Sequence, residues 1–276
     1  PENGFTKPLA ENVTRYDVND RPRVANIEQT LARLQGQIIN PGVIFSFNDI
    51  VGIRSEENGF QQVPVVLKDK VEPDIEAGVR QVATTLYKPA LLIGAKVIER
   101  SISDYYTPAI DYCKQGLEAT VVTSGADLKF QNTLDFPVLI EGTAEQGSLS
   151  IKMLGIRTLP YKVDIRLGRL QKISYDTKIK KDSSLLRGLE VIDQIGIDGY
   201  EIKVFRTYFT LEGVSYREEL LYEKQDEYLA RTAIVRIGTA SSSNLPLNPT
   251  IPHDVSAPPT QPESGDNLDF LDPLGY

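Results

Sequence analysis

Cysteine and histidine, a common nucleophile and the commonest general base, occur once each in this chain of 276 residues. Cys113 is the only cysteine, which excludes an intrachain disulfide and a zinc cluster built from cysteines. His253 is the only histidine and follows Pro252 near the C-terminus. We therefore expect no Ser-His-Asp or Cys-His pair inside the folded body, which excludes much of ordinary hydrolase chemistry. We also expect no metal ion and no cofactor.

The charge of the chain is negative, because 30 Lys and Arg against 38 Asp and Glu give −8 at pH 7. Such a charge disfavours binding to nucleic acid or to anionic lipid. The longest apolar run, Ala90 to Ala95, is far shorter than the roughly 20 residues that cross a bilayer. The sequence begins at Pro1 and shows no signal peptide, so we expect that any targeting segment or membrane anchor lies outside it.

Hydrophobic spacing predicts two helices in the first half of the chain. Ile27, Leu31 and Leu34 recur at helical spacing within residues 23–38. A second helix is expected over residues 79–95, and Pro89 should kink it or divide it in two. The start of the chain is expected to be irregular and residues 69–78 to be a loop. Short strands are expected at residues 43–47, 62–67, 96–100, 118–123, 127–130, 137–143 and 147–154.

The pattern changes near Tyr161 to strand signals alone, such as residues 201–210. Five glycines stand where turns would be needed and are expected to permit positive φ: Gly188, Gly196, Gly199, Gly213 and Gly238. Residues 241–276 carry seven of the 17 prolines, five acidic residues and no Lys or Arg, which predicts a disordered acidic tail. The predicted organisation is an α+β domain over residues 1–158, an all-β domain over 159–240 and the tail over 241–276.

Six phrases follow one another in the first domain: Arg23 to Leu34, Asn40 to Asn48 with Val51 to Arg54, Gln81 to Tyr87, Glu99-Arg100, Gly116 to Val121 and Asp127 to Asn132. In this order they resemble the VanW domain of bacterial cell-envelope proteins. The second domain, with its glycines from Gly188 to Gly238, is similar to the G5 domain, an extracellular β module named for five glycines.

The resemblance implies an exported Gram-positive protein of the vegetative wall or the spore envelope. Some VanW domains are L,D-transpeptidases that cross-link peptidoglycan through a cysteine in a Gly-Gly-Gly-Ile-Cys-Gln phrase. In this chain the corresponding phrase is Glu76-Ala77-Gly78-Val79-Arg80-Gln81, so Arg80 stands at the cysteine position. The His-Ser pair of the family falls on Ser103-Asp104. An arginine offers only hydrogen-bond donors and stays protonated, so the resemblance implies a pseudoenzyme.

The leading interpretation is a non-catalytic protein that binds peptidoglycan or a cell-envelope protein through the degenerate cleft. Two guanidinium groups in that cleft could pair with carboxylates of stem peptides. Arg80 could equally make a structural salt bridge with Glu76 or Asp104. The residues expected to line the cleft are Arg80, Gln81, Thr84, Tyr87, Arg100, Ser103, Asp104 and Tyr105.

Two other classes of function stay open. One is an active transpeptidase or hydrolase with relocated residues, in which Thr84 or Thr85 is activated by Asp104 or Lys88, or in which Cys113 is the nucleophile. Cys113 could equally be a small hydrophobic core residue. The other class is a pure protein–protein scaffold that acts through the β domain or the tail. The ligand and the oligomeric state do not follow from the sequence.

Overall fold

The computed structural model describes residues 4–67, 70–103, 112–221 and 226–241. All but the first residue of the predicted tail lies outside these described residues. The chain folds into two compact units. The first consists of Pro1–Ile179 with Ile192–Val235, and the second of Lys180–Val191 with Arg236–Tyr276. The predicted boundary between residues 158 and 159 stays a prediction.

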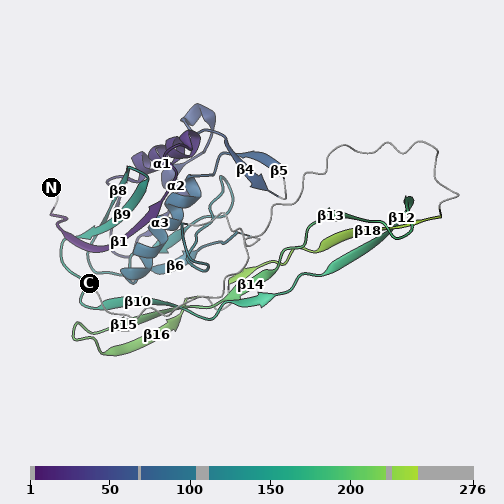
Figure 1. The fold of residues 1–276 in the computed structure, drawn as a ribbon. Helices are drawn as coiled ribbons and strands as arrows, with labels where there is room; N and C mark the ends of the chain where they lie inside the picture. The colour runs from purple at the N-terminus through teal and green to yellow at the C-terminus, as the bar shows by residue number, and fades with distance from the viewer. Residues whose placement is uncertain (1–3, 68–69, 104–111, 222–225, 242–276) are drawn as a thin grey trace. The chain divides into compact units, whose positions relative to one another are not determined.

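Helices and strands alternate through the first part of the first unit (Figure 1). The helices are α1 (Arg21–Leu34), α2 (Phe47–Val51), the 3-10 turn η1 (Glu56–Asn58) and α3 (Val79–Leu92). The strands are β1 (Lys7–Arg15), β2 (Ile38–Ile39), β3 (Ile44–Ser46), β4 (Val63–Leu67), β5 (Lys70–Asp74), β6 (Lys96–Glu99), β7 (Lys129–Gln131), β8 (Val138–Glu145) and β9 (Ser148–Gly155).

From residue 162 onward the described residues form strands and no helix. These strands are β10 (Lys162–Leu167), β11 (Gln171–Ile173), β12 (Thr177–Leu186), β13 (Glu190–Gln194), β14 (Gly199–Ile202), β15 (Val204–Phe209), β16 (Ser215–Leu220), β17 (Asp226–Tyr228) and β18 (Ala233–Ala240). Three three-stranded sheets result, in the orders β10-β15-β16, β11-β14-β17 and β12-β18-β13.

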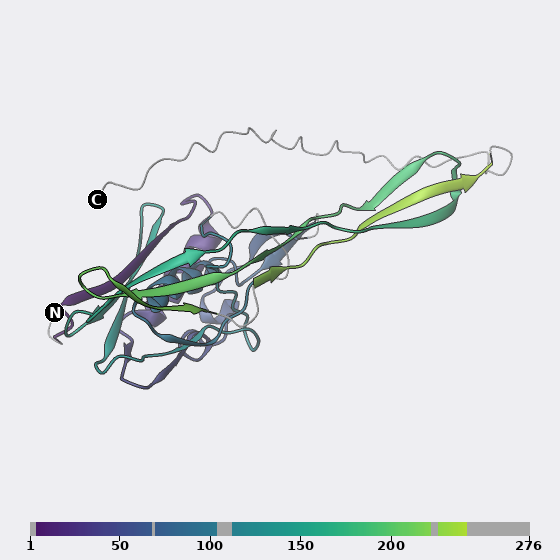
Figure 2. The same ribbon diagram turned by 90° about the horizontal axis from the view of Figure 1, so that it is seen from below.

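Helix α3 packs against a four-stranded antiparallel sheet in the order β1-β9-β8-β2 (Figures 1 and 2). Its apolar side chains Val82, Leu86 and Ala90, and Ile93 directly after its end, are at most 1% exposed, as their helical spacing predicts. Helix α1 contacts both α3 and β8. Asp20 caps the start of α1 by accepting a hydrogen bond from the backbone N–H of Arg23 at 3.3 Å. The hydrophobic core of the first unit therefore lies around α3.

Pro89 neither ends nor divides α3, because the carbonyl that it deprives of a partner finds another. Proline has no N–H to give to the carbonyl four residues earlier, which is that of Thr85. The side-chain amide of Asn12 on β1 donates to this oxygen at 3.3 Å. The helix continues to Leu92, three residues short of the predicted end. A strand packed beside the helix thus repairs the break that the sequence predicts.

An arginine from the β part, by which we mean strands β10 to β18, caps the C-terminal end of α3. Arg206 on β15 donates to the carbonyl oxygens of Leu91 at 3.3 Å and Ala95 at 2.7 Å, and its Nε lies 2.6 Å from Glu219. The residue is 5% exposed. The Tyr161 hydroxyl donates to the Ile93 carbonyl at 3.0 Å. Side chains of residues after 160 thereby add hydrogen bonds to carbonyl groups at and just beyond the C-terminus of α3.

Several predicted elements are corrected by the structure. The irregular start is strand β1, and the expected loop at residues 69–78 contains β5, which pairs with β4. The expected strand at 118–123 is reduced to one isolated bridge between Ser101 and Thr120. Residues 201–210 divide into β14 and β15 instead of forming one strand. The first helix ends at Leu34, because Gly36 turns the chain with φ at 79°.

Of the five glycines expected to have positive φ, two do, and the other three have φ outside that region. Gly188 and Gly213 both have φ at 90°. Gly238 instead allows a close approach of backbones in the second unit, since a Cβ there would lie 1.9 Å from the Leu186 carbonyl oxygen. In the same unit Asp182 accepts hydrogen bonds from Ser184 and Arg236, which lower the pKa of Asp182 to about 2.

Among the described residues, we find no helix with the length and apolar character that crossing a membrane requires.

Candidate functional site

The start of α3, where the resemblance puts a reactive cysteine, holds an ion pair. Arg80 is in the first turn of the helix, and its Nη2 donates to the carboxylate of Asp74 at the end of β5. The two side chains are 30% and 14% exposed. A cation at a helix N-terminus is unfavourable on its own, and the Asp74 carboxylate offsets that cost. Gly78 precedes the helix with φ at 88°, and a Cβ there would lie 2.7 Å from the Arg23 carbonyl oxygen.

Arg80 pairs with Asp74 and not with Glu76, one of the two partners that the sequence predicts, because Glu76 is bonded to other residues. Glu76 is buried, and one of its carboxylate oxygens accepts a hydrogen bond from Nε of Arg54 at 3.0 Å. Its other oxygen accepts hydrogen bonds from the backbone N–H and the hydroxyl of Thr123. A salt bridge from Arg80 to Glu76 is therefore wrong as a prediction. The alternative partner, Asp104, lies outside the described residues.

Gln81 and Thr84 lie inside the fold and not on an open surface. The Gln81 amide donates to the Thr14 hydroxyl at 3.2 Å and to the Arg15 carbonyl at 2.7 Å, which ties α3 to β1. The Thr84 hydroxyl lies 3.0 Å from the backbone N–H of Ala119 and 3.3 Å from its carbonyl. Gln81 and Thr84 are only 1% and 2% exposed, so neither side chain is open to a ligand in this conformation.

The second predicted guanidinium, that of Arg100, is also buried. Its Nε donates to the Glu118 carbonyl at 2.6 Å and its Nη1 to Asp226 on β17 at 2.6 Å. It lies over the ring of Tyr87, which is 0% exposed. The side chain of Arg100 is 1% exposed, so the structure corrects the expectation that it faces a cleft beside Arg80.

Of the remaining predicted residues, Ser103 is the one that the structure describes. The Ser103 hydroxyl is half-buried and lies 3.4 Å from that of Thr120. Asp104 and Tyr105 lie outside the described residues. Of the predicted cleft, only Arg80 among the described α3 residues keeps appreciable exposure.

A buried polar cluster surrounds Arg100. Tyr228 on β17 accepts a hydrogen bond from the backbone N–H of Gly116 at 3.0 Å and bonds with the carboxyl group of Glu118. Burial raises the pKa of the Glu118 carboxyl group, against the lowering effects of Tyr228 and Arg100. Burial likewise raises the pKa of Tyr228. Because Asp226 and Tyr228 lie on β17, this cluster connects residues 100–118 to a strand far along the chain, within the first unit.

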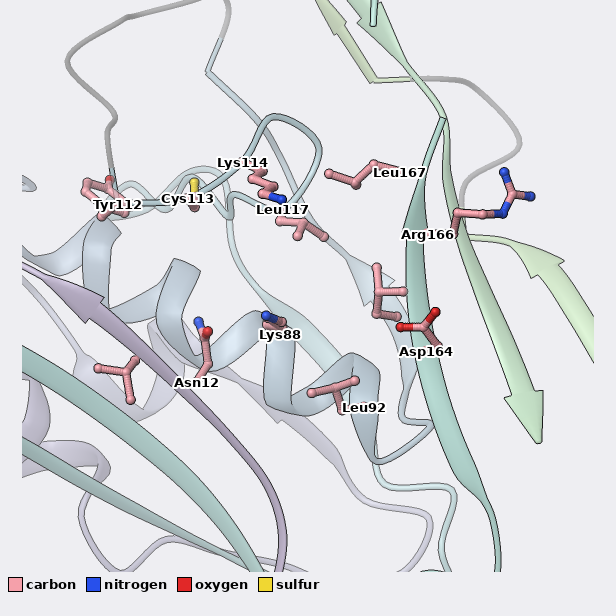
Figure 3. Close-up of a pocket in the computed structure, with 12 residues that line it drawn as sticks. Asn12, Lys88, Leu92, Tyr112, Cys113, Lys114, Leu117, Asp164, Arg166 and Leu167 are labelled. Carbon is pink, nitrogen blue, oxygen red and sulfur yellow. The ribbon is translucent and has the colours of Figure 1, made fainter. Parts of the chain in front are cut away.

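An open cavity of about 670 Å³ lies along the exposed side of α3, and we call it the α3 pocket (Figure 3). Helix α3, β1, the segment 112–117 and β10 form its walls. Its volume is within the range typical of sites for small ligands. The lining residues are Asn12, Val13, Lys88, Leu92, Tyr112, Cys113, Lys114, Leu117, Asp164, Ile165, Arg166 and Leu167.

Positive charge predominates in the α3 pocket. Lys88 and Lys114 contribute two ammonium groups, and no described residue forms an ion pair with either of them. The Arg166 guanidinium turns away from the space and pairs with Glu218 at 3.2 Å (Figure 3). Among the described lining residues, Asp164 carries the one carboxylate. A pocket with this surplus attracts anionic groups in a protein whose net charge is −8.

Cys113, the single cysteine, lines the α3 pocket between Tyr112 and Lys114 and is half-buried (Figure 3). It is thus not sealed inside the hydrophobic core. Burial raises the pKa of the Tyr112 hydroxyl, so this phenol is neutral and able to donate a hydrogen bond at neutral pH. Lys88 was named from the sequence, whereas Asn12, Tyr112 and the residues of β10 were missed because they come from distant segments. Within the described residues there is no group of three His, Cys, Asp or Glu that could hold a metal ion.

Comparison with known proteins divides the chain in two. Residues 22–154 match the family described as VanW like protein, and residues 169–240 match the G5 domain. The chain carries a VanW-like domain followed by a G5 domain. The resemblance inferred from the sequence is therefore confirmed, as is a mixed α/β domain followed by an all-β domain. Both kinds of domain are typical of extracytoplasmic cell-envelope proteins, which agrees with a cell-wall-associated protein.

One relative is the uncharacterized protein YoaR of Bacillus subtilis (strain 168), 29% identical over 168 residues. The match covers 61% of this chain and 52% of YoaR, so the chain spans about half the length of that relative. Two solved G5 structures are also similar. The IgA1 protease G5 domain is 18% identical with a TM-score of 0.24, covering 29% of this chain and 94% of that one. The G5 domain of HP0197 is 19% identical with a TM-score of 0.20, covering 28% and 97%.

Proposed function

We propose that this VanW-like protein is a pseudoenzyme of the Gram-positive cell envelope that binds a carboxylate-bearing peptide in the α3 pocket. The observation that carries the proposal is the ion pair between Arg80 and Asp74 at the start of α3. At this position a cysteine would be activated by the helix N-terminus. A guanidinium held by a carboxylate supplies neither a nucleophile nor a base. The chemistry implied by the family is therefore absent here, while a cavity beside the same helix persists.

The chemistry of the α3 pocket supports a peptide as the ligand. Lys88 and Lys114 can form charge-assisted hydrogen bonds with carboxylates, each contributing on the order of 1.5–3 kcal/mol. Asn12 offers an amide, and Leu92 and Leu117 offer apolar surface. Peptidoglycan stem peptides and acidic segments of envelope proteins both carry the carboxylates that such a lining selects.

A second candidate function, an enzyme with a relocated nucleophile, is favoured by one observation. Cys113 lines the α3 pocket together with Lys88 and Lys114. Neighbouring cations stabilise a thiolate and so increase its reactivity. Against this candidate, the described lining contains no histidine, and Asp164 is its one carboxylate. We therefore place binding ahead of catalysis.

Charge reversal at Lys88 should weaken ligand binding at least tenfold, equivalent to about 1.4 kcal/mol. The Lys88→Glu variant puts a carboxylate where the pocket would hold one of the ligand, so the expected loss is electrostatic. Binding of disaccharide-tetrapeptide muropeptides or of an acidic peptide is measured by isothermal titration calorimetry. Arg80→Ala is the matched control, because it removes a cation of the same helix that does not line the pocket. We expect it to change affinity less than twofold.

The reverse result would move the binding surface. If Arg80→Ala weakens binding tenfold and Lys88→Glu has no effect, the ligand lies at the helix start and the α3 pocket is not the site. Binding unchanged in both variants would point to the G5 domain or the tail, as a pure scaffold requires.

A further inference from the structure

A second cavity continues the α3 pocket along the same strands. It measures about 360 Å³, most of the residues that line it are apolar, and Leu92 lines both cavities. The α3 pocket touches residues 12–13 of β1 and 164–167 of β10, and the second cavity touches residues 8–10 and 161–163. We call the two together the β1–β10 groove. The residues of the second cavity are Pro8, Leu9, Ala10, Leu92, Leu159, Tyr161, Lys162, Val163 and Leu211.

The groove follows the edges of two strands and not their faces. Successive side chains of a strand point to opposite faces of its sheet. A cavity lined by four consecutive residues, Asp164 to Leu167, therefore lies beside the strand edge, where backbone as well as side chains are accessible. The runs Pro8 to Ala10 and Tyr161 to Val163 lead to the same conclusion for the second cavity.

Both strands lack a pairing partner on one side among the described residues. Among the described residues, β1 pairs with β9 alone and β10 with β15 alone, so each is the outer strand of its sheet. An outer strand presents a row of backbone N–H and C=O groups that can accept an added strand. Residue numbers rise in the same direction along both strands of the groove, so β1 and β10 present similar rows to whatever lies between them.

We propose that the β1–β10 groove binds an acidic segment of a partner protein in extended conformation, as a strand added to β10 or β1. This inference rests on the proposed function and specifies its ligand. The segment lays its carboxylates over Lys88 and Lys114 and its apolar end against Leu9, Leu159 and Leu211. Main-chain hydrogen bonds supply affinity and the two lysines supply selectivity, as in other cases of strand addition.

The length and charge of the groove identify its occupant. Residues 161–167, which are Tyr161 and the whole of β10, line it, and seven extended residues reach over roughly 20 Å. A segment of about six residues therefore fills it. Lys88 and Lys114 complement an acidic segment. A stem peptide, which alternates L and D residues, does not present side chains alternately to two faces as an L-peptide strand does.

The test compares two forms of one synthetic peptide with the full chain. The probe is a capped hexapeptide with apolar residues at one end and two glutamates at the other, prepared in both sequence directions. The second form carries N-methyl groups on alternate backbone nitrogens, which keep the charges and remove strand hydrogen bonds. We expect the N-methylated form to bind at least tenfold more weakly by calorimetry, and Lys88→Glu to weaken the unmodified form at least tenfold.

Each other outcome has a distinct meaning. Equal binding of both forms would overturn strand addition while leaving a charge-selective pocket. Binding of muropeptides but not of either peptide would also overturn this inference and leave the proposed function intact. If none of the probes binds, both fail. A variant ending at Ser241 that binds the peptide tenfold more tightly than the full chain would make the chain's own C-terminal segment the occupant and overturn a partner protein.

Discussion

Replacing Arg206 with alanine should lower the free energy of unfolding by about 3–5 kcal/mol. The guanidinium is almost fully buried, caps the Leu91 and Ala95 carbonyls at the end of α3 and pairs with Glu219. Its removal takes a donor from each of those oxygens, although the Gly94 N–H still bonds that of Leu91, and it removes the buried partner of Glu219. Breaking a buried ion pair costs about this much. Urea denaturation followed by circular dichroism measures the change.

Arg166→Ala is the matched control for Arg206→Ala. Arg166 lies on the adjacent strand β10 and pairs with Glu218, next to Glu219, but the two side chains are 53% and 47% exposed. Exposed pairs contribute at most about 1 kcal/mol. If the two variants lose similar stability, Arg206 does not cap the helix in solution, and the packing of β15 against α3 is wrong.

Replacing Asp226 with alanine should destabilise the first unit by about 3–5 kcal/mol as well. Asp226 accepts Nη1 of Arg100 at 2.6 Å, and the two side chains are 10% and 1% exposed. The variant leaves the guanidinium charge buried beside Tyr87 with one ionic partner fewer, which costs more than the pair contributes when intact. Thermal and urea denaturation of the purified variant measure the loss.

Asp198→Ala is the control for Asp226→Ala, because Asp198 is only half-buried and pairs at 2.6 Å with Lys172, whose side chain is 59% exposed. We expect a loss below about 1 kcal/mol there. A double variant, Arg100→Ala with Asp226→Ala, should lose less than the sum of the two single variants, because the buried charge is then removed with its partner. Additive losses would contradict a direct ion pair between them.

The contacts of Arg206 and Asp226 cross the sequence boundary between the two domains, so each domain contributes to the stability of the other. Arg206 and Asp226 belong to the G5 domain, yet each completes a polar group of the VanW-like domain. The β strands that carry them fall within the same compact unit as α3. We infer that the VanW-like domain needs the adjoining part of the G5 domain for its full stability.

Helices were predictable from the sequence to the extent that their apolar spacing is regular. The 79–95 prediction located α3 and its buried face, since Val82, Leu86 and Ala90 recur at helical spacing. Its behaviour at Pro89 was not predictable, because the compensating amide belongs to Asn12, 73 residues from Thr85. Strand β1 was missed for a similar reason. Its sequence, Lys-Pro-Leu-Ala-Glu-Asn-Val-Thr-Arg, lacks a clean alternation, and pairing with β9 decides its structure.

The candidate site was less predictable than the fold. Motif positions identified Arg80, Gln81, Thr84 and Arg100, but the sequence does not show which of these side chains are buried. Arg100 finds its partner 126 residues away, at Asp226, and no local pattern announces such a contact. The α3 pocket draws its lining from β1, α3, the segment 112–117 and β10, so its existence depends on packing. Of the residues that line it, the sequence singles out Lys88 as a possible base and Cys113 as a possible nucleophile.

We propose that this VanW-like protein binds its ligand without catalysing a reaction, and incubation with tetrapeptide muropeptides tests the absence of catalysis most directly. The protein and the muropeptides are analysed together by mass spectrometry, with Cys113→Ser as the comparison. We expect unchanged muropeptide masses, no 3-3 cross-linked dimers, and an intact protein mass without an acyl adduct, for both proteins. Cross-linked dimers or an acyl adduct on Cys113 that disappear in Cys113→Ser would contradict the claim and establish the relocated enzyme in its place.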